Sequence, residues 1–153
     1  MQTSEPVVRI SIRDQRLDLL SGDEVLASYP VSTSRFGLGS EEGSFKTPLG
    51  RFRIAEKIGA EMPLGTIFRG RVPLTPGDPL PQTEDLITSR ILWLDGLEQH
   101  NANTRARFIY IHGTKHEEEI GQPASHGCVR MRNVDIADLF DRIPVATEVR
   151  IET

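Results

Sequence analysis

Residues 7–31 read VVRISIRDQRLDLLSGDEVLASYPV, and this stretch decides the fold class. Apolar and polar residues alternate over 8–12, which is the period of two expected of a half-buried β-strand. The alternation returns over 17–19, and residues 21–23 (SGD) give a turn signal before a further extended run at 25–31. The stretch therefore predicts a β-meander.

The rest of the chain continues as strands joined by loops. Residues 32–50 are rich in Ser, Gly and Thr, which is loop composition. Residues 59–84 contain four prolines between positions 73 and 81, which exclude a regular helix. This segment predicts a surface loop or lid with short strands inside it. Further strands are expected at 51–54, 87–94, 107–111 and 148–151.

One segment near the C-terminus has the pattern of a helix. Asn133 is a suitable N-cap, and Asp135 lies in the first turn, where the helix dipole favours a negative charge. Pro144 ends the helix. The apolar face consists of Ile136, Ala137, Phe140 and Ile143. The fold class predicted from these patterns is mainly β, with one short C-terminal helix.

The bulk composition is that of one folded domain covering residues 1–153. Hydrophobic residues make up 37% of the chain and charged residues 26%, which is a globular rather than a disordered profile. The formal net charge of -4 argues against the broad basic face that binds nucleic acid. No apolar run approaches the roughly 18 residues of a spanning helix, so no membrane span is expected.

The N-terminal residues bear on the cellular location of the protein. Residues 1–15, MQTSEPVVRISIRDQ, contain no basic stretch followed by a long apolar run, so no secretory signal is visible. If Met1 is the native start, the sequence predicts a cytoplasmic protein. If an export signal has been trimmed, it predicts a periplasmic one.

The chemistry of the chain is concentrated in residues 110–133, YIHGTKHEEEIGQPASHGCVRMRN, which hold three of the four histidines and the only cysteine. One cysteine cannot form an intramolecular disulfide. A thiol titrates near about 8.5, so a cysteine nucleophile needs an imidazole to take its proton. The run His126-Gly127-Cys128 supplies both groups, and the amides of Gly127 and Cys128 are candidates for an oxyanion hole.

Two histidines are candidates for the base. In an extended backbone, His126 and Cys128 point to the same side. His112 ends a predicted strand and is followed by Gly113, so it can project into the same cleft. The residues alone leave both histidines open as the base.

A zinc site is the alternative use of these side chains. The possible ligands are His112, His116, His126 and Cys128. Two histidines four residues apart share a face only on a helix, and Gly113 and Thr114 follow a strand-like run instead. We therefore expect no metal.

The motif also carries a family resemblance. His112-Gly113, followed by residues 125–131 (SHGCVRM), resembles the signature of the L,D-transpeptidase catalytic domain (YkuD) family. Gly43-Ser44 and residues 47–52 (TPLGRF) resemble the turn before a strand in that family. The resemblance implies a β-sandwich-like or barrel-like domain without a metal or organic cofactor.

The resemblance also implies roles for the motif residues. Cys128 would attack the carbonyl that joins the L-centre of a diamino acid to a terminal D-alanine. His112 would be the general base, oriented through its other ring nitrogen by a backbone carbonyl such as that of Gly113. His126 would line the site, and Arg130 would either order it or meet a substrate carboxylate.

Three further residues complete the predicted site. Gly127, Ser125 and Tyr110 are assigned with Arg130 to substrate binding or to the oxyanion hole. The expected partners are peptidoglycan stem peptides or soluble muropeptides, and the oligomeric state is left open.

The resemblance leaves the acyl acceptor undecided. The absence of a visible export signal favours water, which would make the protein an L,D-carboxypeptidase of murein recycling. The alternatives are an L,D-transpeptidase that cross-links the wall and a non-catalytic peptidoglycan-peptide binding module. The intact set of His112, His126 and Cys128 argues against the binding module.

Overall fold

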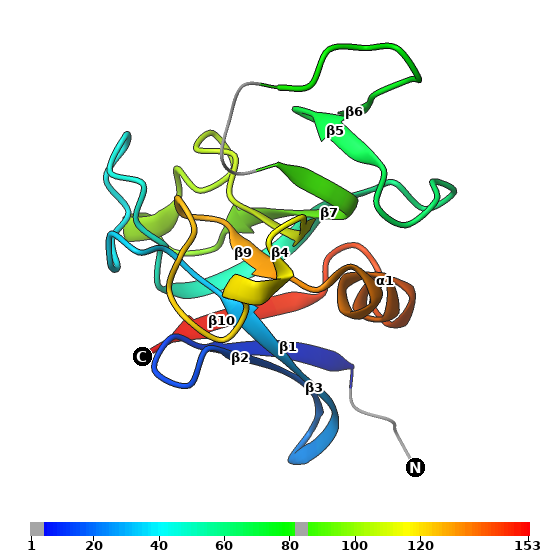
Figure 1. Ribbon diagram of the computed structural model, residues 1–153. Helices are drawn as coiled ribbons and strands as arrows, with labels where there is room; N and C mark the ends of the chain where they lie inside the picture. The colour runs from blue at the N-terminus through cyan, green and yellow to red at the C-terminus, as the bar shows by residue number, and fades with distance from the viewer. Residues whose placement is uncertain (1–4, 82–85) are drawn as a thin grey trace.

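A computed structural model describes residues 5–81 and 86–153 and consists mainly of strands (Figure 1). The described residues contain one α-helix, α1 (Asn133–Arg142), and two 3-10 turns, η1 (Gln99–Asn101) and η2 (Glu117–Glu119). The strands are β1 (Pro6–Ser11), β2 (Arg16–Ser21), β3 (Glu24–Ser32), β4 (Gly50–Ile58), β5 (Ile67–Arg69), β6 (Val72–Pro73), β7 (Ile87–Gly96), β8 (Tyr110–Thr114), β9 (Val129–Met131) and β10 (Glu148–Glu152).

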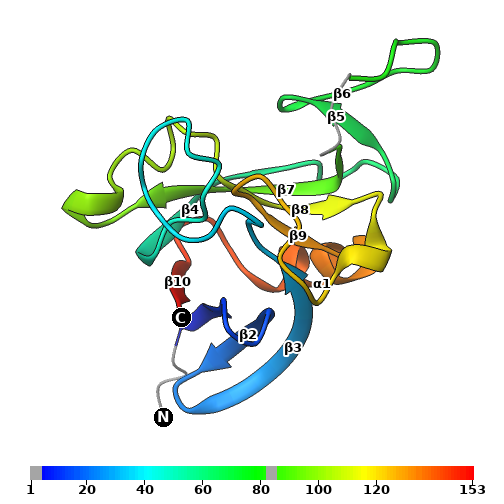
Figure 2. The same ribbon diagram turned by 60° about the vertical axis from the view of Figure 1, so that its left-hand side comes forward.

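The sheet closes on itself. Its order is β4-β10-β1-β2-β3-β9-β8-β7-β5-β6, and β4 also pairs with β7, so eight strands form a ring. The β1–β10 and β8–β9 pairs are parallel, and the other pairs are antiparallel. The β5–β6 hairpin extends beyond the ring from the edge of β7 (Figure 2). The mainly β, barrel-like architecture confirms the predicted fold class.

The core fills the inside of this ring. The predicted period of two is confirmed, because Val8, Ile10, Leu17 and Leu19 are all buried there. α1 contributes Ile136, Leu139 and Phe140 to the same cluster and lies beside the sheet in Figure 1. Burial of apolar surface from both sheet and helix is the main driving force for this arrangement.

The strand predicted at 107–111 is displaced. β8 begins only at Tyr110, because residues 102–108 form consecutive turns. The amide of Arg107 donates to Asn103 O, and the amide of Phe108 donates to Arg105 O. Phe108 has φ +59°, which takes it out of the extended region. The sequence prediction was wrong here because an apolar run does not reveal a turn held by backbone hydrogen bonds.

The helix start also differs by one residue. The N-cap is Arg132, and Asn133 is the first helical residue. The Asn133 amide nitrogen donates to Glu117 Oε2 at 2.8 Å, so a distant carboxylate caps the helix. The Asn133 side chain is then available to bind β7 and β8, through Thr88 and the carbonyl of Thr114.

The proline-rich segment contains the expected short strands. β5 and β6 form a hairpin within residues 59–81, and the expected end of the segment, 82–84, lies outside the described residues. Whether the segment closes as a lid stays a prediction. In the described part of the chain, no helix is both long enough and apolar enough to cross a bilayer.

Asp18 on β2 is expected to make stability depend on pH. The carboxylate is 4% exposed and accepts hydrogen bonds from Ser28, Arg9 and Arg16. Burial raises its pKa, but these hydrogen bonds outweigh burial and leave the pKa below its usual value. A lowered folded-state pKa stabilises the protein above the unfolded value, and this stabilisation is lost as pH falls through the folded value.

We therefore expect Asp18→Asn to lower the free energy of unfolding by about 1–3 kcal/mol at pH 7. The deficit relative to wild type should shrink as the pH falls below 4. Urea unfolding at pH 7 and at pH 3 measures both values. A deficit that is the same at both pH values would contradict the charge argument.

Candidate active site

Strands β8 and β9 bring the two halves of the motif together. They are parallel neighbours, with Ile111 opposite Val129 and His112 opposite Arg130. Ile111 and Val129 point into the core, so His112 and Arg130 lie on the other face of the sheet. Cys128 immediately precedes β9 and packs with the apolar cluster on that outer face. The sheet register thus places His112, Arg130 and Cys128 on one side.

The Cys128 sulfur is held between two backbone groups. The thiol donates to Phe108 O at 3.4 Å, and the amide of Tyr110 donates to Sγ at 3.3 Å. The side chain is half-buried, so a substrate can reach it. An amide directed at the sulfur stabilises the thiolate more than the thiol, because the hydrogen bond becomes charge-assisted. Tyr110 therefore contributes to the site through its backbone.

Phe108, which contacts the Cys128 sulfur, has a strained backbone. A bulky residue at φ +59° is a conformational outlier, and its side chain is 52% exposed. Such backbone strain persists only where surrounding contacts hold the residue in place, and strained residues of this kind are frequent at functional sites. Here the turn directs the Phe108 carbonyl at the thiol of Cys128.

His112 is completely buried, and its tautomer follows from its partner. Its Nδ1 lies 2.6 Å from the carbonyl oxygen of Gly113. A carbonyl can only accept, so Nδ1 carries a proton and Nε2 is the basic nitrogen of the neutral ring. This is the orienting contact that the family resemblance implied for His112.

His126 has the opposite arrangement. A guanidinium nitrogen of Arg35 lies 2.7 Å from His126 Nε2. Arginine can only donate, so Nε2 is the acceptor and the ring proton is on Nδ1. The rings of Phe36 and Phe45 pack against the imidazole at centroid distances of 5.7 Å and 5.9 Å. The Nε2 lone pair of His126 is thus engaged by Arg35.

The backbone at 126–128 is a bend rather than a strand. Gly127 has φ +122°, a backbone angle that residues with a side chain rarely adopt. Its carbonyl oxygen accepts a hydrogen bond from Thr47 Oγ1 at 3.0 Å. The extended geometry that would put His126 and Cys128 on one side is therefore absent. His126 instead faces Phe36 and Phe45, whereas the Cys128 sulfur faces Phe108 and Tyr110.

Ser125 supports this bend from inside. Its side chain is completely buried, donates to Cys128 O at 2.6 Å and accepts from the Gly127 amide at 3.2 Å. These contacts give Ser125 a structural role in the bend, and its predicted role in substrate binding or the oxyanion hole stays a prediction. The Gly127 amide, one of the two predicted oxyanion donors, is engaged with Ser125.

Arg130 is a buried cation. It is 2% exposed, and its Nη1 lies 3.5 Å from Glu119 Oε2. The two roles expected from the sequence were ordering the site and meeting a substrate carboxylate. Burial together with an ion pair to η2 favours the ordering role.

Gly113 is expected to be intolerant of substitution. A Cβ there would lie 2.6 Å from both Asn133 Oδ1 and Thr88 O, which no packed atom tolerates. Gly113→Ala should lower stability by about 1–3 kcal/mol and shift the carbonyl that orients His112. Thermal unfolding measures the first effect. An unchanged unfolding temperature would contradict this prediction and would show that β7 and α1 move apart to accommodate the added methyl group.

The acidic 3-10 turn η2 provides the one group with metal-ligand geometry in the described ranges. The ligand atoms of His116, Glu118 and Glu119 lie within 4.8 Å of one another. His116 already pairs with Glu118 at 3.3 Å. Of the four possible ligands named for the zinc alternative, the group contains only His116, and exposed acidic groups of this kind commonly hold no ion.

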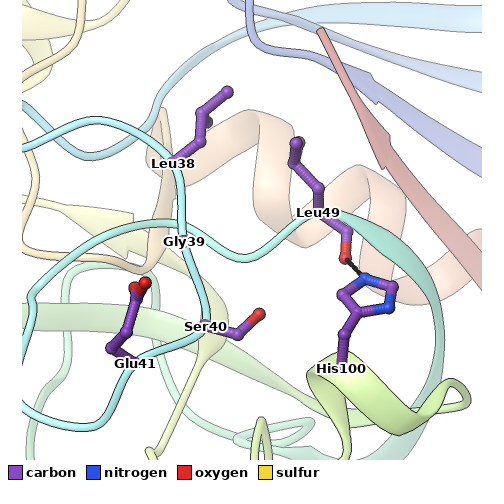
Figure 3. Close-up of a pocket in the computed structure, with 6 residues that line it drawn as sticks. All are labelled: Leu38, Gly39, Ser40, Glu41, Leu49 and His100. Atoms are coloured by element: carbon purple, nitrogen blue, oxygen red, sulfur yellow. Dashed lines mark hydrogen bonds between the residues drawn. The ribbon is translucent and has the colours of Figure 1, made fainter.

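Two cavities adjoin the loop over residues 35–49. One, of about 300 Å³, is lined by Arg35, His116, Glu119, Ala124, His126 and Arg130, and so contains two predicted site residues. The other, of about 540 Å³, is lined by Leu38, Gly39, Ser40, Glu41, Leu49 and His100 (Figure 3). In Figure 3 the His100 ring reaches the carbonyl oxygen of Leu49, at 3.0 Å. None of the predicted catalytic residues lines this larger cavity.

Sequence reasoning missed the residues that hold the site from a distance. Arg35 and Thr47 lie in the segment read as a plain loop, yet they contact His126 and Gly127. Arg107 holds the same loop by donating to Lys46 O at 2.8 Å. The loop composition gave no signal for these contacts, because they depend on which segments meet in space.

Comparisons with known proteins point to one family. The model of the L,D-transpeptidase catalytic domain family matches residues 5–151. YqjB of Bacillus subtilis strain 168, named as an L,D-transpeptidase, is 29% identical over 147 residues, covering 96% of this chain and 71% of YqjB.

Two solved structures share the fold. The L,D-transpeptidase of Xylanimonas cellulosilytica has a TM-score of 0.65 at 20% identity, over 98% of this chain and 61% of that one. L,D-transpeptidase 3 of Mycobacterium tuberculosis, solved with a faropenem-derived adduct, has a TM-score of 0.63 at 15% identity, over 97% and 60%. The chain thus spans about three fifths of the length of these structures.

Proposed function

The chain belongs to the L,D-transpeptidase catalytic domain family, and from this membership we propose that it cleaves the bond before the terminal D-alanine of peptidoglycan tetrapeptide stems. The reaction would proceed through an acyl-enzyme on Cys128. The observation that carries the proposal is the pair of contacts that poise nucleophile and base: Tyr110 N–H to Sγ, and His112 Nδ1–H to Gly113 O.

The acylation step follows from these contacts. His112 Nε2 takes the thiol proton, and the Cys128 sulfur attacks the carbonyl carbon to give a tetrahedral intermediate. When the intermediate collapses, the C–N bond breaks and the D-alanine amine leaves with the proton that His112 held. The product is a thioester between Cys128 and the remaining stem peptide.

The supporting residues would act on this intermediate without exchanging protons. The Cys128 amide is the proposed oxyanion donor, and the bend held by Ser125 fixes its direction. His126, bound by Arg35, would line the oxyanion side of the site. Arg130 would hold η2 against β9 through Glu119.

We further propose that water resolves the acyl-enzyme, which makes the protein an L,D-carboxypeptidase. Two arginines lie on this side of the sheet: Arg107 interacts electrostatically with Cys128, and Arg71 donates to the hydroxyl of Tyr110, whose amide contacts the sulfur. An amine acceptor arrives mainly as an ammonium ion, which these cations repel, whereas water is unaffected. His112 would then deprotonate the water that hydrolyses the thioester.

Product analysis tests both parts of the proposal. The protein is incubated with a disaccharide-tetrapeptide and, separately, with a carbapenem, while intact mass and released products are followed. We expect a covalent adduct on Cys128, together with tripeptide and D-alanine in equal amounts. A cross-linked dimer in place of tripeptide would assign the activity to L,D-transpeptidation. No adduct and no product from folded, reduced protein would instead favour the peptide-binding module.

A further inference from the structure

Arg71 stands at the tip of the β5–β6 hairpin. Arg69 pairs with Val72, so Gly70 and Arg71 form a two-residue turn. Gly70 has φ +60°, which is the conformation such tight hairpin turns require. Gly70 therefore suits the first position of this turn, and Arg71 occupies the second position, with its guanidinium over Trp93.

The guanidinium of Arg71 lies on an aromatic surface. Its Cζ is 4.6 Å from the ring centroid of Trp93 and 5.4 Å from that of Phe108. Its Nη1 donates to the hydroxyl of Tyr110 at 3.0 Å. Cation–π contacts and one neutral hydrogen bond hold the group in place while leaving its charge uncompensated.

A second arginine on the same tryptophan shows the contrast. Arg105 also lies over Trp93, at 4.9 Å, but it pairs with Glu56 at 2.9 Å. Within residues 5–81 and 86–153, Arg71 has no carboxylate partner. Arg71 is thus a fixed cation with guanidinium donors available for an anion, and Arg105 is not.

Two of the three aromatic residues that contact Arg71 also contact the Cys128 sulfur. The Tyr110 amide and the Phe108 carbonyl both contact Cys128 Sγ. Tyr110 therefore contacts both groups: its backbone amide contacts the thiol, and its hydroxyl contacts Arg71. Tyr110 thus links Arg71 to Cys128 through a single residue.

From these contacts we propose that Arg71, held in place by the hydroxyl of Tyr110, binds the terminal α-carboxylate of the amino acid that leaves. This inference rests on the proposed function and names the feature by which the site selects its donor peptide. The carboxylate lies one residue beyond the attacked carbonyl, and an extended residue spans about 3.3–3.6 Å. A planar guanidinium fork matches a carboxylate through two parallel hydrogen bonds.

Tyr110 positions Arg71 in this subsite. Its oxygen accepts from Arg71 while the phenol keeps its own proton, and the residue is only 3% exposed, so the guanidinium is the group that meets the carboxylate. Burial raises the pKa of Tyr110, which keeps that proton on the hydroxyl at neutral pH. The site would therefore accept peptides that end one residue after the scissile bond with a charged carboxylate, and discriminate against amidated ends.

The test measures binding without turnover. Trp93 is the only tryptophan of the chain and lies directly under Arg71, so its fluorescence reports on the subsite. The Cys128→Ala protein is titrated with a disaccharide-tetrapeptide and with the same peptide carrying a C-terminal amide. Calorimetry provides a second readout for variants whose Trp93 emission is altered.

We expect the acid to bind about 10-fold to 100-fold more tightly than the amide, the range of a charge-assisted pair. Arg71→Gln should abolish that difference by weakening the acid alone, and Arg71→Lys should retain part of it. The matched control is Arg69→Gln on the same hairpin, whose side chain binds Pro79 O instead. This control should keep the wild-type ratio.

An acid-to-amide ratio that survives Arg71→Gln, or that is near one in the parent protein, overturns the carboxylate role. So does equal weakening of acid and amide, which would mean that Arg71 only supports the aromatic surface. Failure of the proposed function is a separate result: it appears as no D-alanine released by the wild-type protein. A carboxylate preference in the Cys128→Ala protein would stand even then.

Discussion

Cys128→Ala is expected to reduce D-alanine release from a disaccharide-tetrapeptide by about four to six orders of magnitude, the usual loss when a covalent nucleophile is removed. The sulfur is the proposed nucleophile, and it lies between Phe108 O and the Tyr110 amide. Chromatography of released D-alanine measures the loss. Intact mass after carbapenem treatment should show no adduct.

Two controls separate chemistry from folding. Cys128 is half-buried against the apolar cluster of Phe68, Ile91 and Tyr110, so an alanine leaves only a small cavity. The unfolding temperature of Cys128→Ala should therefore stay within a few degrees of wild type. Cys128→Ser keeps the shape and places a weaker nucleophile there, and it should also be nearly inactive. Turnover that persists in both variants would remove Cys128 from the mechanism.

His112→Ala is expected to cause the second largest loss, of about three to five orders of magnitude in turnover. The reason is the proton on Nδ1: bound to Gly113 O, it leaves Nε2 as the basic nitrogen, on the face of the sheet that carries Cys128. Without this base the thiol must ionise unaided. Stopped-assay measurements of tripeptide over several hours provide the necessary sensitivity.

The histidine pair gives the matched comparison. His126→Ala should reduce turnover far less completely, because Arg35 already engages the Nε2 lone pair of His126. His112→Gln, which retains a polar donor for Gly113 O without a base, should be as inactive as His112→Ala. A reversed ranking, with His126→Ala the more damaging variant, would assign the base to His126.

Much of the fold was determined by the sequence alone. Alternation over residues 7–31 predicted the meander, because one-sided burial of a strand requires a period of two. The apolar spacing from Ile136 to Ile143 predicted the helix, because burial on one face requires a period of 3.6. The clustering of His112, His126 and Cys128 identified the reactive segment, since such side chains rarely gather in a domain that has so few of them.

The local sequence pattern could not predict the turns at the candidate site. The run from Phe108 to Ile111 has strand composition, yet a turn held by Arg105 O places Phe108 at positive φ. The His126–Cys128 run is bent by contacts with Ser125 and Thr47. In both cases long-range or turn hydrogen bonds override the local preference of the chain.

The sequence by itself determined which residues can do the chemistry and which fold carries them, because side-chain type and periodicity are properties of the chain. Only the tertiary structure decided how the two histidines differ. Each tautomer is set by a partner: Gly113 O accepts from His112, and Arg35, 91 residues from His126 in the chain, donates to it. The β5–β6 hairpin likewise brings Arg71 to the ring of Trp93. The contacts of Arg35 and Arg71 join segments far apart in the chain, so no local pattern in the sequence predicts them.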